Sequence, residues 1–216
     1  VDMYRGIIQH STYLTDYLKR QIEMRGLALP LGLGRIYRIK WAVAPLGPMP
    51  RLSSASDETL IRHLGHPNGW WRDTAQRLLI ERKAVRSETA LAALATGASD
   101  PRTRVHALWT LEGLGKLTAT TLELASRSTD PKVKGVVAQL AGLQGGDRML
   151  SLLEKMGENA SEEVALGLAA SLPHFYSTHP KRAFATQRKL ANRFPDSALL
   201  VDVIVGSLED KEQTFI

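Results

Sequence analysis

Two adjacent tryptophans followed by an arginine, Trp70, Trp71 and Arg72, are the residues best suited to binding another surface. Neighbouring side chains on a helix point about 100° apart, so the two rings cannot both face one hydrophobic core. One ring is therefore expected at the surface, where Trp beside Arg is typical of protein interfaces. The alternative is structural, with both rings sealing a boundary between packed elements.

His106 and Trp109 lie one helical turn apart in the segment RVHALWTLEG. Apolar residues surround the histidine, which predicts a hydrogen-bonded and partly buried imidazole. Together with the tryptophan pair, these two residues form the candidate interface for a partner protein or a sibling domain.

The other histidines come in two pairs that could suggest a metal site. His63 and His66 are three residues apart, and His174 and His179 flank Phe-Tyr-Ser-Thr. A metal would need a third ligand from elsewhere in the chain, and the proline after His66 places that residue outside a helix. We predict no metal site.

Motifs for catalysis or cofactor binding are missing from the sequence. The chain has no cysteine, which excludes a thiol nucleophile, a thiolate zinc site and a haem attached through Cys-x-x-Cys-His. It has no Gly-x-Ser-x-Gly, and its LGLG stretch precedes a strand-like run rather than a helix, unlike a phosphate-binding loop. We predict no catalytic and no cofactor-binding residue in this chain.

The formal net charge of +6 is spread along the chain, with one local basic cluster in KRAFATQRKLANR. Arg182, Lys189 and Arg193 recur there at helical spacing, opposite Phe184 and Ala191. The pattern fits an ordinary solvated helix face above an apolar stripe. The alternative is a face that binds phosphate groups.

These residues need helices to position them, and the sequence is helical in texture from residue 57 to its end. Apolar residues recur there with a spacing near 3.6, and Gly, Pro, Ser or Asp separates neighbouring segments. The predicted helices cover residues 57–65, 70–82, 87–96, 101–115, 118–126, 131–146, 147–157, 161–172, 180–194 and 196–208.

Helix-initiating pairs recur along this region. His66-Pro67, Asp100-Pro101 and Asp130-Pro131 are separated by 34 and then 30 residues. Asp is a good N-cap and Pro is well tolerated at the first helical position. A longer and a shorter helix per period cannot bury their apolar faces alone, whereas stacked pairs can. The sequence predicts a mainly α fold, a right-handed HEAT-like α-α solenoid (superhelix).

Three regions follow along the chain. Residues 1–41 read as strand, helix and strand, the second strand in the run GRIYRI at 34–39; residues 42–56 form a linker rich in Pro, Gly and Ser; and residues 57–216 form the solenoid. Two strands around one helix cannot bury a core alone. The first region is therefore expected to pack against another domain.

Two stretches carry a resemblance to a known family. VDMYRGIIQHSTYLTDYLKRQIEMRGL through LGLGRIYRI resembles the end of the β-propeller in bacterial membrane-bound or sorbosone-type sugar dehydrogenases, which are often predicted to use pyrroloquinoline quinone (PQQ). HPNGWWRDTAQRLLIER and RVHALWTLEGLG are similar to the HEAT-repeat segment that follows that propeller. The resemblance covers residues 1–145.

The resemblance implies that residues 1–41 are the remnant of the last propeller blade, with the catalytic histidine, PQQ and calcium in blades before Val1. No residue of this chain matches those positions. The propeller, or a cytochrome c module that accepts electrons, would be the partner, and the compartment would be extracytoplasmic.

The predicted function is thus a non-catalytic scaffold for protein interaction. The alternative is a stand-alone helical repeat that binds nucleic acid or another polyanion through the basic helix. Oxidation of a sugar by these residues alone is not expected. The sequence contains no run of the roughly 18–20 apolar residues that a membrane span needs.

Overall fold

The structure is a computed structural model that describes residues 6–8, 10–29, 32–37, 50–208, 211 and 215. These residues are mainly helical and form eleven α-helices and four short 3-10 helices. They contain no strand, and Arg35 takes part in a single β-bridge. The chain divides into two compact units, which we call unit 1 (Val1–Met49) and unit 2 (Pro50–Ile216).

Unit 1 contains one 3-10 helix, η1 (Ser11–Tyr13), and one α-helix, α1 (Asp16–Met24). Thr15 caps α1 by accepting a hydrogen bond from the backbone N–H of Leu18. Gly26 follows the helix at φ +62°, a left-handed conformation that glycine adopts without strain. None of the described residues of unit 1 is buried.

The two strands predicted for unit 1 are not seen in the described residues. VDMYR falls on residues 1–5, which lie outside them. Of the strand predicted at 34–39, residues 34–37 are described; they form no strand, although Arg35 takes part in the β-bridge, and residues 38 and 39 lie outside the described ranges. A strand is assigned only when a neighbouring backbone pairs with it, and the described part of unit 1 offers one bridge.

Unit 2 begins with η2 (Leu52–Ser54) and continues as ten α-helices, interrupted by η3 (Val85–Ser87) and η4 (Leu172–Phe175). The predicted helices are confirmed. Their bounds are α2 (Asp57–His63), α3 (Gly69–Glu81), α4 (Glu88–Gly97), α5 (Pro101–Gly113), α6 (Ala119–Ala125), α7 (Pro131–Gln144), α8 (Asp147–Glu158), α9 (Glu162–Ser171), α10 (Pro180–Arg193) and α11 (Ala198–Ser207).

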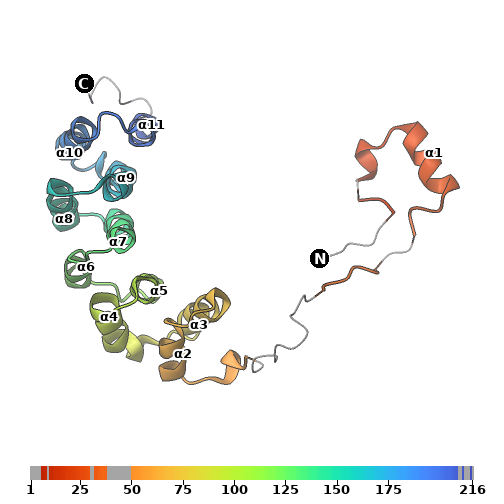
Figure 1. Cartoon of the computed structure of the whole chain (residues 1–216), viewed down its shortest axis with the longest axis horizontal. Helices are drawn as coiled ribbons and strands as arrows, with labels where there is room; N and C mark the ends of the chain where they lie inside the picture. Colours follow the sequence, from red (N-terminus) through yellow and green to blue (C-terminus); the bar gives the residue numbers. More distant parts are fainter. Residues whose placement is uncertain are drawn as a thin grey trace. The chain divides into compact units, whose positions relative to one another are not determined.

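The helices of unit 2 form a curved array of two layers (Figure 1). Each even-numbered helix packs against the odd-numbered helix that follows it in the sequence. The odd-numbered helices α3 to α11 contact one another in series and line the inner side of the curve, and α4, α6, α8 and α10 do the same on the outer side. Sequence neighbours are therefore also neighbours in space.

The hydrophobic core of unit 2 runs along the array between the two layers. Its largest fully buried side chains are Leu60, Leu64, Leu79, Leu91, Leu108, Leu111, Leu122, Leu140, Leu150, Leu153, Leu168 and Phe175. They come from both layers, so each helix pair covers apolar surface of the next. No helix in the described ranges has the length and apolar character needed to cross a membrane.

Side-chain caps fix where the odd-numbered helices begin. Asp100 accepts from the backbone N–H of Arg102 at 3.3 Å, and Asp130 accepts from Lys132 at 2.9 Å, each with Pro at the first helical position. The pair His66-Pro67 differs from this pattern, since the cap of α3 is Asn68. Oδ1 of Asn68 accepts a hydrogen bond from the backbone N–H of Trp70, and Gly69 takes the first helical position.

The last part of the predicted linker packs on unit 2. Leu52 is buried, and the guanidinium of Arg82 donates to the carbonyls of Ser53 and Ala55, both at 2.7 Å. Residues 50–56 therefore belong to the helical unit, because an arginine after α3 satisfies their backbone carbonyls. Of the predicted linker, residues 42–49 lie outside the described ranges.

Candidate interaction site on α3 and α5

The two tryptophans of α3 point to different environments. The side chain of Trp70 is 54% exposed, whereas Trp71 packs partly buried against the core. Their ring centroids are 6.2 Å apart with the planes nearly perpendicular. The offset of about 100° between successive helical residues explains the difference, and it leaves one large ring at the surface.

Trp71 is held in a cluster of aromatic rings. It stacks on His66 with ring centroids 4.7 Å apart and lies 4.9 Å from the ring of His63. His66 is fixed in turn because its Nδ1 accepts from the backbone N–H of Asn68 at 3.1 Å. The pKa of His63 is lowered, first by burial and then by electrostatic interaction with His66 and Arg62. These contacts pack the end of α2 and the turn before α3 against Trp71, the neighbour of Trp70.

His63 and His66, one of the two histidine pairs considered as metal ligands, pack against Trp71 in this way. No group of three or more His, Cys, Asp or Glu among the described residues is arranged to hold a metal ion.

Arg72 links the turn before α3 to α5. Its Nη1 donates to the carbonyls of His66 at 2.7 Å and Pro67 at 3.0 Å, and its Nε donates to Nε2 of His106 at 3.2 Å. The guanidinium therefore satisfies backbone acceptors near Trp70 and joins two successive odd-numbered helices.

The contacts of His106 define its tautomer. Nε2 accepts from Arg72, so the proton of the neutral ring lies on Nδ1, which donates to Oε1 of Gln76 at 2.7 Å. Burial lowers the pKa of His106, and the charge of Arg72 lowers it further, while Asp73 and Asp100 act in the opposite direction. His106 is therefore a neutral bridge between α3 and α5.

The structure brings Trp71, Arg72 and His106 together and places Trp70 at the surface beside them. Trp109, the fifth residue predicted for this interface, is partly buried and packs against the hydrophobic core. The site presents the exposed ring of Trp70 beside the packed side chain of Trp71.

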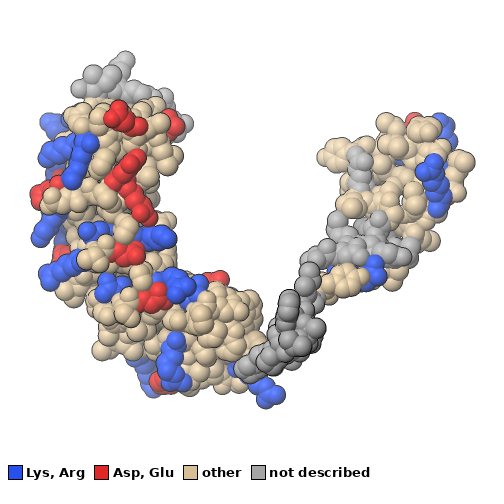
Figure 2. All heavy atoms as spheres, viewed as in Figure 1, with Lys and Arg blue, Asp and Glu red and all other residues tan. Residues whose placement is uncertain are grey.

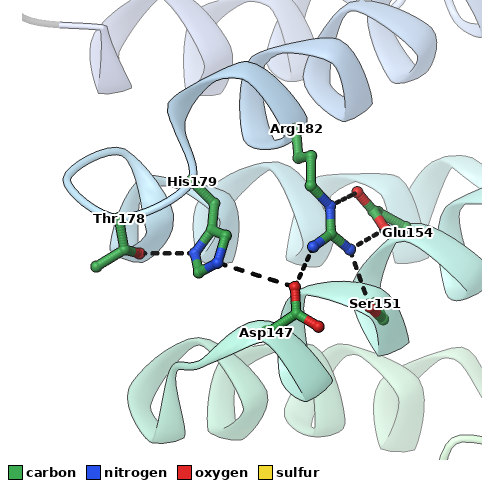
Figure 3. Close-up of polar contacts among 6 residues, drawn as sticks. All are labelled: Asp147, Ser151, Glu154, Thr178, His179 and Arg182. Carbon is green, nitrogen blue, oxygen red and sulfur yellow. Dashed lines mark hydrogen bonds and ion pairs between the residues drawn. The ribbon is translucent and has the colours of Figure 1, made fainter.

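The basic helix predicted at 180–194 is α10, and its arginines are engaged within unit 2 (Figure 3). Arg182 donates to both carboxylate oxygens of Glu154, at 2.9 and 2.6 Å, to Asp147, and to Ser151 at 2.9 Å. These acceptors all belong to α8, and the bonds to Glu154 above all raise the pKa of Arg182. Arg182 thus ties α10 to α8, and a phosphate would have to displace two carboxylates to reach it.

The other two residues of that predicted face are placed differently. Arg193 donates to the carbonyl of Glu158 at 2.6 Å. Lys189 lines a cavity of about 440 Å³ between α8 and α10, together with Arg193 and Glu154. His179 lies beside the contacts of Arg182 (Figure 3). Its Nε2 is 3.8 Å from Oδ1 of Asp147, and its Nδ1 is hydrogen-bonded to the hydroxyl group of Thr178.

A second basic site was missed by sequence reasoning. Arg127, Lys134, Arg148 and Lys155 line one cavity between α6 and α8. They come from three different elements and form no local cluster in the sequence, so only the packing of the helices brings them together. In Figure 2, Lys and Arg follow the edge of unit 2 formed by α6, α8 and α10.

Comparisons with known proteins found no relative of this chain. No protein-family model matches the chain, and searches of curated proteins and of solved structures gave no significant match. The described residues define a mainly helical protein whose second unit is an array of paired helices with an exposed aromatic anchor.

Proposed function

We propose that this chain is a non-catalytic scaffold whose unit 2 is a HEAT-like α-solenoid that binds a partner protein or a sibling domain. Five pairs of helices stack in series, and each pair covers apolar surface of its neighbour, as in repeat proteins. The N-caps of the odd-numbered helices recur along the chain at Asn68, Asp100, Asp130, Ser161 and Ser197.

The observation that carries the proposal is that the ring of Trp70 is exposed beside the packed ring of Trp71. A large aromatic side chain that is already ordered contributes contact area on binding with little loss of conformational entropy. The ring of Trp70 lies edge-on to that of Trp71, with centroids 6.2 Å apart, and Trp71 is itself stacked on His66.

The test compares Trp70 with Leu143, which lies on α7 and is equally exposed at 54%. A photo-crosslinking residue is placed at either position in the cell that makes the protein, and the adduct formed at position 70 is identified and purified. Trp70→Ala should weaken the affinity for that purified partner by about tenfold or more, and Leu143→Ala by less than about twofold. Equal losses for the two variants, or none for Trp70→Ala, would refute the proposal.

Unit 1 supports a sibling domain as the partner. Its described residues include no buried side chain, yet Tyr17, Met24 and Ile36 are 62%, 79% and 86% exposed. Exposed apolar surface of this kind usually marks a site where another domain or protein binds. We propose that unit 1 completes the β-propeller of a quinone-dependent sugar dehydrogenase whose PQQ, calcium and active site lie outside this chain.

That part of the proposal is tested by the reading frame upstream of Val1 and by activity. Several hundred residues of repeated four-strand pattern should precede Val1, and the whole protein with added PQQ and Ca²⁺ should oxidise a sugar. The 216 residues alone should not. A start codon directly before Val1, or sugar oxidation by the isolated chain, would contradict this assignment.

A second candidate function is binding of nucleic acid along the basic edge of unit 2, which Figure 2 shows over α6, α8 and α10. The internal bonds of Arg182 weigh against a contribution from that residue. Salt distinguishes the two functions, because affinity for a phosphate backbone falls steeply with ionic strength and Trp-centred docking does not.

A further inference from the structure

The cavity between α6 and α8, which we call the α6–α8 groove, has a volume of about 420 Å³. Its walls carry Arg127, Lys134, Arg148 and Lys155, with Glu123 as the single acidic residue. Cavities of this size are typical of ligand sites. The groove is lined mainly by the turn after α6 and by α8, with Lys134 contributed by α7, whereas Trp70 belongs to α3.

Only one of the four cations in the groove is paired. Arg148 donates to both oxygens of Glu123, at 2.7 and 2.9 Å, in a two-point contact that also lowers the pKa of this carboxyl group. Within the described residues, Arg127, Lys134 and Lys155 make no ion pair and no side-chain hydrogen bond. The groove therefore keeps three positive charges that a bound anion could neutralise.

The lining of the groove also has an apolar part, Leu152 and Met156, which we call the apolar floor; Leu152 is 7% exposed and Met156 is partly buried. The remaining lining residues, Ser126, Ser151 and Asn159, are polar and uncharged. A ligand that fits must combine several negative charges with an aliphatic group. The lining includes no aromatic ring on which a nucleic-acid base could stack, so a peptide fits better than an oligonucleotide.

We propose that the α6–α8 groove binds an acidic peptide segment of a partner protein. Its Asp and Glu carboxylates pair with Arg127, Lys134 and Lys155, and an aliphatic side chain between them packs on Leu152 and Met156. The inference rests on the proposed scaffold function in that the ligand is a protein, but it concerns a different surface from Trp70. The partner is recognised by charge complementarity together with a small apolar contact.

The test uses the full chain and a dye-labelled peptide of about twelve residues made of Glu, Asp and Leu, with binding measured by fluorescence anisotropy. The variant R127Q/K155Q removes two cations of the groove. The matched control R86Q/K132Q removes the same charge from exposed positions outside the cavity lining. Both pairs are exposed, and their thermal unfolding checks that the variants are folded.

We expect R127Q/K155Q to weaken peptide binding by about tenfold or more and R86Q/K132Q by less than about twofold. Replacing Leu by Ser in the peptide should also weaken binding, because it removes the contact with the apolar floor. Equal losses for the two double variants would show a nonspecific charge effect and overturn the proposal. The proposal would also be overturned if a single-stranded oligonucleotide of similar length bound more tightly than the peptide and if R127Q/K155Q abolished that binding.

The variant Trp70→Ala separates this inference from the proposed function. It should leave peptide binding unchanged within about twofold, since α3 contributes no residue to the groove. Failure of the peptide to bind wild-type protein overturns the groove proposal and leaves the crosslinking result at position 70 standing. Loss of peptide binding in Trp70→Ala would overturn the claim that the two surfaces are separate.

Discussion

At the scale of single residues, His106 shows how a histidine of the predicted interface joins two helices of its own unit. Its two ring nitrogens are both used, one as acceptor from Arg72 and one as donor to Gln76. Protonation of Nε2 would place a second hydrogen opposite the arginine N–H. The neutral form is therefore the form that fits between α3 and α5.

This geometry predicts a pH dependence of stability. Because the pKa of His106 is lower in the folded state than its ordinary value of 6.5, the unfolded chain binds the proton more readily. The stabilising contribution is complete above about pH 6.5 and is lost as pH falls toward the lowered pKa. His106→Asn should thus show a smaller drop in Tm between about pH 7.5 and 5.5 than the wild type, measured by circular dichroism.

His63 provides the comparison for this experiment. Its pKa is also lowered, so His63→Asn should remove a further part of the pH dependence, and the double variant should be flatter than either single one. An unchanged slope of Tm against pH in His106→Asn would show that the imidazole is not held neutral by its surroundings.

The sequence anticipated part of this residue-scale picture. The different environments of Trp70 and Trp71 follow from helical geometry alone. The partners of His106 lie 34 and 30 residues away, and those of Arg182 lie 28 to 35 residues away. Such distant pairs depend on how helices stack, which local pattern does not specify.

At the scale of elements, the close packing of α7 on α9 depends on glycine. A Cβ atom built on Gly167 of α9 would lie 3.1 Å from the Cα of Gly135 on α7. The neighbour there is backbone, so the helices themselves would have to move apart. A Cβ atom on Gly135 meets no atom within 4 Å, so the requirement applies to Gly167.

The two glycines form a matched pair of test positions inside helices. Gly167→Ala should lower the free energy of unfolding by about 1–3 kcal/mol through overpacking. Gly135→Ala should raise it by up to about 1 kcal/mol, because alanine favours the helix and finds open space. Chemical denaturation of both variants measures the difference, and a stabilising Gly167→Ala would refute the close contact.

Elements were the best-predicted level of the fold. Asp100 and Asp130 begin their helices with local side-chain caps, and proline follows each of them. These signals act within a few residues, so the sequence alone is enough to place them. The strand predicted at 34–39 needed a partner strand, and its described residues 34–37 form only the β-bridge of Arg35.

At the scale of the whole molecule, the serial packing of unit 2 predicts that local stability decreases from the middle of the array to its ends. Helices in the middle, such as α7, have neighbours on both sides, whereas α11 is the last helix of the described array, and its Leu199 and Val205 are 61% and 58% exposed. In a serial stack, the ends open at lower free energy than the centre. Amide hydrogens of α11 should exchange about tenfold faster or more than those of α7, as measured by mass spectrometry.

The opposite outcome is equally informative. Uniform exchange from α2 to α11 would show that unit 2 opens as one cooperative body, in contrast to a serial array. The same measurement on Gly167→Ala should increase exchange mainly in α7 and α9, because their contact is the one that the substitution disturbs.

The sequence by itself determined the helices of unit 2 and their order, because periodicity, caps and breaks are local properties of a chain. Only the tertiary structure decided which charges are already paired. Arg182 is bound by carboxylates of another helix, and Arg127 and Lys155 stand unpaired around a cavity. Pairing depends on distances between residues far apart in sequence, and the packing of helices sets those distances.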